Sequence, residues 1–149
     1  MADVGFYHLL LSGPDRSLPT LLGRTLGTGH RAVVVCGSDE RVAALDAALW
    51  LATDPDWLPH GTVLSGHPEL QPIWLATDDC APNGARFLFL LDGCTSARLD
   101  AFERVFDLFD GRDGTAVAAA RRRWVAAKAA GHRLTYWQQT ERRWERRGS

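Results

Sequence analysis

The stretch that decides the fold is AVVVCGSDERVAALDAAL, residues 32–49. Its first five residues form a β-branched, apolar run, which is typical of a central strand covered on both faces of a sheet. Ser38 or Asp39 then provides a helix N-cap, and apolar residues recur with the helical period as far as Leu49. The segment therefore predicts a buried strand followed at once by an amphipathic helix.

The same order of elements precedes this stretch. Residues 4–11 are mostly apolar and end at a Ser-Gly-Pro turn, so they predict a first, largely buried strand. Ser17 is a suitable N-cap for the helix that follows, and Gly27 and Gly29 end that helix. Further strands are expected at residues 73–76, 87–91 and 104–109, a short helix at 96–102, and a long helix from residues 113–115 to Gly131.

This alternation of strands and helices predicts the fold class α/β. We expect a single domain with a largely parallel or mixed central sheet, flanked by helices in a Rossmann-like three-layer arrangement. The glycine-rich residues 23–30 do not form a phosphate loop, because their glycines close a helix and open a strand rather than the reverse. The domain is expected to span residues 1–139, with residues 140–149 as a charged, disordered tail.

The composition of the chain indicates where in the cell the protein works. No apolar run approaches the ~20 residues that a membrane span requires, and the N-terminus lacks the features of a signal peptide. The three cysteines are an odd number without Cys-x-x-Cys spacing, which fits a reducing environment. We therefore expect a cytoplasmic protein without a membrane partner.

Motifs for catalysis are scarce in this chain. The histidines form no His-Glu-x-x-His pair, and no serine lies in a Gly-x-Ser-x-Gly elbow. Asp92 ends a predicted strand, where α/β enzymes often place catalytic groups, but it has no visible partner. We expect a protein that is not an enzyme, with no cofactor, no metal and no small-molecule substrate.

Charge is distributed very unevenly along the chain. Residues 116–149 hold nine Lys and Arg against two acidic residues, a net charge of +7, although the whole chain carries only −1. The remaining residues hold eight basic against sixteen acidic side chains, a net charge of −8. Such asymmetry indicates an acidic partner.

The predicted C-terminal helix carries a stripe of mixed chemistry. With 100° per residue, Val117, Arg121, Trp124 and Lys128 fall within about 60° of one another. Two cations beside an apolar pocket suit a ligand with a carboxylate and a buried hydrophobic group. A structural interpretation stays open, because a helical Trp is usually part of a core and a run of arginines is usually a solvated face.

Two other functions stay open at this stage. Arginine clusters with nearby Trp and Tyr are also used to bind single-stranded nucleic acid, and Arg142, Arg143, Arg146 and Arg147 extend this basic end. The acidic remainder of the domain would repel a long phosphate backbone, which favours a short acidic peptide. The hypothesis of a small nucleotide-using enzyme is supported only by Asp92 and by the glycines of residues 23–30.

Residues 102–139, FERVFDLFDGRDGTAVAAARRRWVAAKAAGHRLTYWQQ, closely resemble the C-terminal half of the chi subunit of bacterial DNA polymerase III. Four further blocks resemble the same family in the same order. These blocks are GFYHLL at residues 5–10, GHRAVVVCGSDERVAALDAALW at 29–50, DPDWLPHG at 54–61 and NGARFLFLLDG at 83–93.

The resemblance implies a non-catalytic accessory of the replicase clamp loader. Members of that family bind the acidic C-terminal tail of single-stranded DNA-binding protein, and a small partner, psi, links them to the clamp loader. DNA would then be reached only indirectly. The implied tail-site residues in this sequence are Arg121, Trp124, Trp50 and Trp57, with Lys128 and His60 nearby.

One position departs from the family pattern. Some relatives carry a second basic residue one turn before the arginine, and this chain has Val117 there. Arg122, Arg123 or Lys128 is the expected source of a compensating charge.

Overall fold

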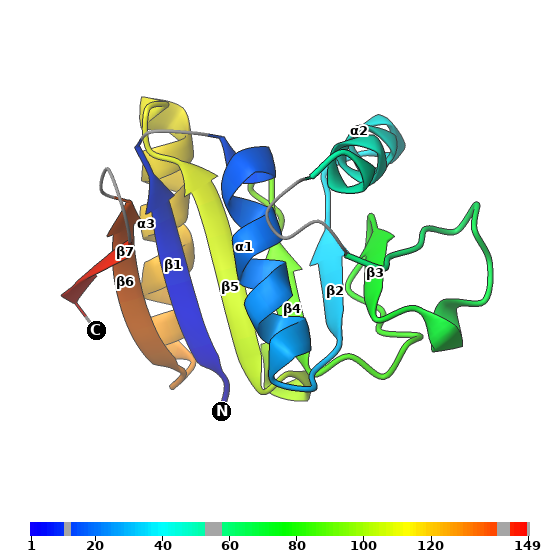
Figure 1. The fold of residues 1–149 in the computed structure, drawn as a ribbon. Coiled ribbons are helices and arrows are strands. Elements are labelled where there is room, and N and C mark those ends of the chain that lie inside the picture. The colour runs from blue at the N-terminus through cyan, green and yellow to red at the C-terminus, as the bar shows by residue number, and fades with distance from the viewer. Residues whose placement is uncertain (11–12, 53–57, 140–143, 149) are drawn as a thin grey trace.

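The computed structural model describes residues 1–10, 13–52, 58–139 and 144–148. Its helices and strands alternate along the chain as the sequence predicts (Figure 1). The helices are α1 (Pro14–Gly27), α2 (Asp39–Trp50) and α3 (Gly114–Ala129), with short 3₁₀ turns at Pro68–Leu70 and Leu99–Ala101. The strands are β1 (Asp3–Leu9), β2 (Ala32–Val35), β3 (Ile73–Ala76), β4 (Phe87–Leu90), β5 (Arg104–Asp110), β6 (Arg133–Gln139) and β7 (Trp144–Gly148).

All the strands form one seven-stranded sheet in the order β3-β2-β4-β5-β1-β6-β7. The first six strands are parallel to their neighbours, and β7 runs antiparallel to β6. Helices α1 and α2 cover one face of this sheet and α3 covers the other, so three layers result (Figure 1). The predicted α/β class with a largely parallel sheet is confirmed.

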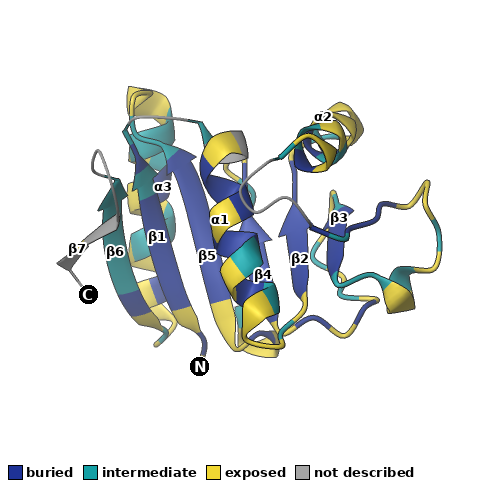
Figure 2. Ribbon diagram, in the orientation of Figure 1, coloured by how far each residue is buried: buried dark blue, intermediate teal, exposed yellow. Residues whose placement is uncertain are grey.

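The sheet separates two hydrophobic cores because successive strand residues face opposite sides. Val34 and Leu108 pack beneath α1 and α2, whereas Val33 and Val105 pack beneath α3. The central strands are buried from both sides (Figure 2). Their near-continuous apolar sequences follow directly from this double coverage.

The helix boundaries confirm some capping predictions and correct one. The Ser38 hydroxyl oxygen accepts the Arg41 backbone N–H at 3.2 Å, as expected for an N-cap. Gly29 has a φ of +81° just after α1, so the glycines do close that helix. The predicted N-cap Ser17 is wrong, because Gly13 is the N-cap and α1 starts at Pro14. Proline is tolerated there since the first helical N–H needs no intrahelical partner.

The C-terminal part differs from expectation. No strand is expected after α3, yet β6 follows it, and Trp144–Gly148 forms β7 rather than part of a disordered tail. Strand β6 would otherwise end the sheet with unpaired backbone groups, which β7 satisfies. Residues 140–143 and 149 of the expected tail lie outside the described residues.

The opposite edge of the sheet is covered in another way. Gly61 forms an isolated parallel bridge with Trp74 of β3. The Gly61 N–H donates to the Ile73 carbonyl at 3.0 Å, and the Leu75 N–H donates to the Gly61 carbonyl at 3.0 Å. None of the described helices is long and apolar enough to cross a membrane.

Candidate peptide-binding site

Helix α3 positions the basic residues near the C-terminus. The Asp113 carboxylate caps its start by accepting the Thr115 N–H at 2.9 Å, and Gly131, with a φ of +87°, follows its end. The small side chains of Ala120 and Ala127 are buried against the sheet, so the helix lies close to it. Alanine at these positions both favours the helix and permits this close packing.

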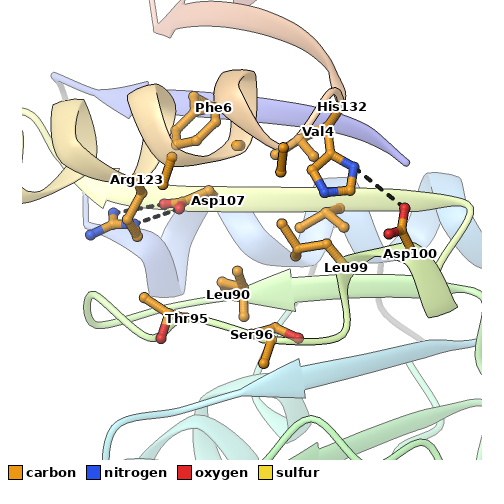
Figure 3. Close-up of a pocket in the computed structure, with 15 residues that line it drawn as sticks. Val4, Phe6, Leu90, Thr95, Ser96, Leu99, Asp100, Asp107, Arg123 and His132 are labelled. Atoms are coloured by element: carbon orange, nitrogen blue, oxygen red, sulfur yellow. Dashed lines mark hydrogen bonds and ion pairs between the residues drawn. The ribbon is translucent and has the colours of Figure 1, made fainter. Parts of the chain in front are cut away.

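An ion pair fixes α3 to the sheet. Arg123 donates from Nε to Oδ2 of Asp107 at 2.6 Å and from Nη2 to Oδ1 at 2.9 Å (Figure 3). Both side chains are largely buried. Burial raises the pKa of the Asp107 carboxyl, and the bonds from Arg123 oppose that rise. Arg123 is therefore committed to Asp107 and cannot supply the compensating charge expected beside Val117.

An apolar pocket of about 390 Å³ lies between α3 and strands β1, β5 and β6. Its walls are Phe6, Phe109, Val117, Ala120, Trp124, Val125 and Tyr136, with Arg121 at the same site. The Trp124 ring lies edge-on to Phe6 at 5.2 Å and to Tyr136 at 6.1 Å between ring centroids. This aromatic contact network holds Trp124 in place, so the pocket is preformed.

Arg121 is the charged group of this pocket. It is exposed, and within the described parts of the chain no carboxylate lies at ion-pair distance from it. Burial raises the pKa of the Tyr136 hydroxyl, and the Arg121 charge opposes this rise, so the guanidinium lies near that end of the pocket. The Tyr136 hydroxyl is also hydrogen-bonded to Nδ1 of His8. The site thus pairs an apolar cavity with an unneutralised guanidinium.

The family model of the DNA polymerase III chi subunit, HolC, matches residues 1–135. This chain belongs to that family. No curated protein sequence matches it significantly. The chi subunit is an accessory of the DNA polymerase III holoenzyme, so the protein belongs to the DNA replication machinery. The match includes α3 and the start of β6, and it ends before β7.

The structure of this chi-family chain brings together only part of the predicted site. Val117, Arg121 and Trp124 share the pocket. Lys128 is exposed one turn beyond Trp124 on α3 but does not line the cavity. Trp57 lies outside the described residues.

Trp50 and His60 lie elsewhere in the molecule. Trp50 ends α2, which covers the sheet face opposite α3 and lies toward the β3 edge (Figure 1). Its ring contacts His60 at 4.4 Å between centroids. The buried His60 ring is held by the Leu58 carbonyl at 2.6 Å and by the Asp46 carboxylate at 3.0 Å. The structure therefore separates these two residues from the α3 pocket.

Most of the large exposed apolar side chains fall in one segment of the sequence, which begins at Trp50. Of the seven large hydrophobic residues exposed in the described chain, five fall between residues 50 and 70. These are Trp50, Leu51, Val63, Leu64 and Leu70, which we call the 50–70 surface. No sequence pattern predicts this surface, because its residues have no common period and lie in a Pro- and Gly-containing segment. Exposed hydrophobic residues of this kind are candidates for an interaction site.

Asp92, the one candidate catalytic carboxylate, has structural partners. It accepts the Gly37 N–H at 3.0 Å and the Arg41 Nε–H at 3.1 Å. These bonds join the end of β4 to the start of α2. No group of three metal-ligating side chains occurs among the described residues.

Proposed function

We propose that this chi-family protein is a non-catalytic replisome adaptor whose α3 pocket binds the acidic C-terminal tail of single-stranded DNA-binding protein. One observation carries the proposal: Arg121 stands without an ion-pair partner among the described residues, at an apolar cavity of about 390 Å³. A tail with aspartates and an apolar last residue offers both a carboxylate and a side chain for such a site. A soluble replication complex in the cytoplasm is the setting that this role requires.

The magnitudes are compatible with weak, specific binding. A charge-assisted hydrogen bond contributes roughly 1.5–3 kcal/mol, and full burial of a Phe-sized side chain contributes a further ~1.5–3 kcal/mol. Micromolar affinity corresponds to about 8 kcal/mol. A bidentate Arg121–carboxylate contact with one buried aromatic ring supplies most of that, and Lys128 adds long-range attraction.

The position of Val117 shapes how the tail is held. It contributes to the apolar wall where some relatives carry a cation, and Arg123 is engaged with Asp107. Arg121 is then the principal anion-binding group of this site. We expect a tail affinity that falls with salt, because the interaction is exposed to solvent.

The link to the clamp loader through psi requires a second surface. We propose the 50–70 surface for it, since it holds five of the seven large apolar residues exposed in the described chain, and it begins at the end of α2, on the opposite face of the sheet from α3. Two separate surfaces would let the adaptor hold both partners at once. Leu64→Glu, at a residue that is 92% exposed, should abolish co-purification of psi and leave tail affinity unchanged. Retained psi binding by this variant would reject the assignment.

The tail site is tested by titrating a labelled acidic peptide that ends in Phe. Wild type and Arg122→Ala should bind alike, because Arg122 is exposed on α3 and does not line the pocket. Arg121→Ala should bind at least ~10-fold more weakly, as loss of a charge-assisted contact implies. Equal affinity for wild type and Arg121→Ala, or no binding to either, would reject the site.

A further inference from the structure

A second groove lies on the other face of the sheet. It occupies about 430 Å³ beside α1, over strands β5, β1 and β6. Its floor is aromatic: Tyr7 stacks on Phe106 at 5.7 Å and on Trp137 at 6.1 Å between ring centroids. Tyr7 and Phe106 are buried and Trp137 is half-buried, so the tryptophan is the ring of this stack that a ligand can reach most easily.

Two arginines border this aromatic floor. The Arg104 guanidinium lies over the Phe106 ring, 4.8 Å from its centroid, and Arg24 reaches the groove from α1. Burial raises the pKa of the Tyr7 hydroxyl, and the charges of Arg104 and Arg24 both oppose that rise. Both cations therefore act on the same point of the groove. Neither has a carboxylate at ion-pair distance in the described part of the chain.

Strand β7 adds a third cation to this face. Arg146 is exposed and pairs in register with Trp137 of β6. Residues directly opposite each other in an antiparallel pair project from the same face of the sheet. Trp137 thus has Tyr7 on one side, and Arg146 stands on the same face on the other side.

Among the described residues, acidic side chains at the groove are fewer than basic ones. Glu103 is the carboxylate among the lining residues, and its Oε2 lies 3.8 Å from Nε2 of His30. Arg24, Arg104 and Arg146 outnumber it. The local charge is therefore positive, although the first 115 residues together are acidic.

We propose that this groove binds single-stranded nucleic acid, with phosphates at Arg24 and Arg104 and a base against Trp137. Flat aromatic rings beside unpaired arginines are the combination that sequence-tolerant single-strand sites use. An acidic peptide would find cations here, but its apolar end would meet a more polar lining than the α3 pocket offers. The proposal concerns a direct contact with nucleic acid, and it does not depend on tail binding at Arg121.

The test is fluorescence anisotropy with a labelled oligothymidylate of about 15 nucleotides, over a range of salt concentrations. Two to three phosphate contacts predict a slope of log K against log[salt] of about −1.4 to −2.1, from −0.7 per contact. Arg24→Ala/Arg104→Ala should weaken binding at least ~10-fold and reduce the magnitude of the slope by about 1.4. The single variant Arg24→Ala, at an exposed helical position, should reduce the magnitude of the salt slope by about half as much as the double variant does.

Matched variants separate this groove from the rest of the basic surface. Arg122→Ala removes the same charge from the α3 side and should retain wild-type oligonucleotide affinity, as should Arg121→Ala. Trp137→Phe should weaken binding while preserving the salt slope, because it alters stacking and not charge. Thermal unfolding of each variant checks that it is folded.

Several results would overturn the proposal. One is the absence of oligothymidylate binding to wild type at low salt. Another is an equal loss of oligothymidylate affinity in Arg122→Ala and Arg24→Ala. A third is binding of an oligo-aspartate peptide that depends on Arg24 and Arg104, while the oligothymidylate does not bind. That last result would assign the groove to an acidic peptide.

Discussion

The two sides of α3 hold two arginines with opposite roles. Toward β4, Arg123 borders a pocket of about 300 Å³ and is bound to the buried carboxylate of Asp107 (Figure 3). Toward β6, Arg121 borders the apolar pocket and has no such partner among the described residues. The two side chains are identical and only two positions apart, so what distinguishes them is the sheet beneath. An arginine whose carboxylate lies in the same chain stabilises the fold, and one without it can bind a ligand.

The largest expected effect tests the structural side of this comparison. Arg123→Ala should lower the free energy of unfolding by about 3–5 kcal/mol, because it leaves the buried Asp107 carboxylate without a counter-charge. Urea denaturation measures this. The double variant Arg123→Met/Asp107→Leu is the control and should recover most of the loss, since it removes both charges. An Arg123→Ala protein as stable as wild type would show that the ion pair does not hold α3.

The loss of stability in Arg123→Ala should depend on pH, because it arises from the charge of Asp107. The pKa of Asp107 is raised by burial even in the presence of Arg123, and removing the arginine should raise it further. A carboxyl with a raised pKa in the folded state binds its proton more tightly there than when unfolded. It therefore costs stability as the pH rises above the unfolded value of about 3.9.

The stability difference between wild type and Arg123→Ala should accordingly shrink as the pH falls toward 4. Paired urea titrations at several pH values would measure it. A difference that stays constant between pH 4 and 7 would mean that the Asp107 charge is not the cause.

Arg121→Ala tests the other side of α3. Its free energy of unfolding should stay within about 0.5 kcal/mol of wild type, as is usual for an exposed side chain without a structural partner. Its affinity for the acidic peptide should fall by about 1.5–3 kcal/mol. Denaturation and peptide titration of the same preparation provide both numbers. A large loss of stability would place Arg121 with Arg123 as a structural residue and remove the contrast.

The smallest expected effect concerns Val117. Val117→Lys would place a second cation beside Arg121 and should strengthen peptide binding by up to about 1 kcal/mol at low salt, the upper range for an exposed ion pair. Val117→Met, which keeps the apolar wall, is the matched control. Weaker binding of Val117→Lys would show that the apolar wall matters more than added charge.

Most elements of the fold could be predicted from period and capping. The run of valines before Ser38 defines β2 and α2 because a strand covered on both faces requires an unbroken apolar sequence. Strand β6, RLTYWQQ, could not be predicted in this way, because its half-exposed position next to the last strand of the sheet retains polar residues on both faces. Strand β7 was missed because its pairing with β6 is made by the backbone, which leaves little trace in the sequence.

The candidate site could be predicted only in part. The helical period placed Val117, Arg121 and Trp124 on one side of α3, where the structure shows a pocket. Nothing in the run of three arginines indicates which one turns inward, because that depends on Asp107 facing α3 from β5. A resemblance assigns residues to a function without saying which face of the sheet they occupy, and so Trp50 was grouped with Arg121.

The parallel strands of the sheet are bordered on both sides by short segments of the chain itself, β7 along β6 and Gly61 beside β3. An unpaired edge strand can accept a strand from another protein through backbone hydrogen bonds, which recognise sequence weakly. These segments keep β6 and part of β3 from being recruited by that route. Side-chain surfaces differ from such an edge, because a replacement of one residue there can separate one partner from another.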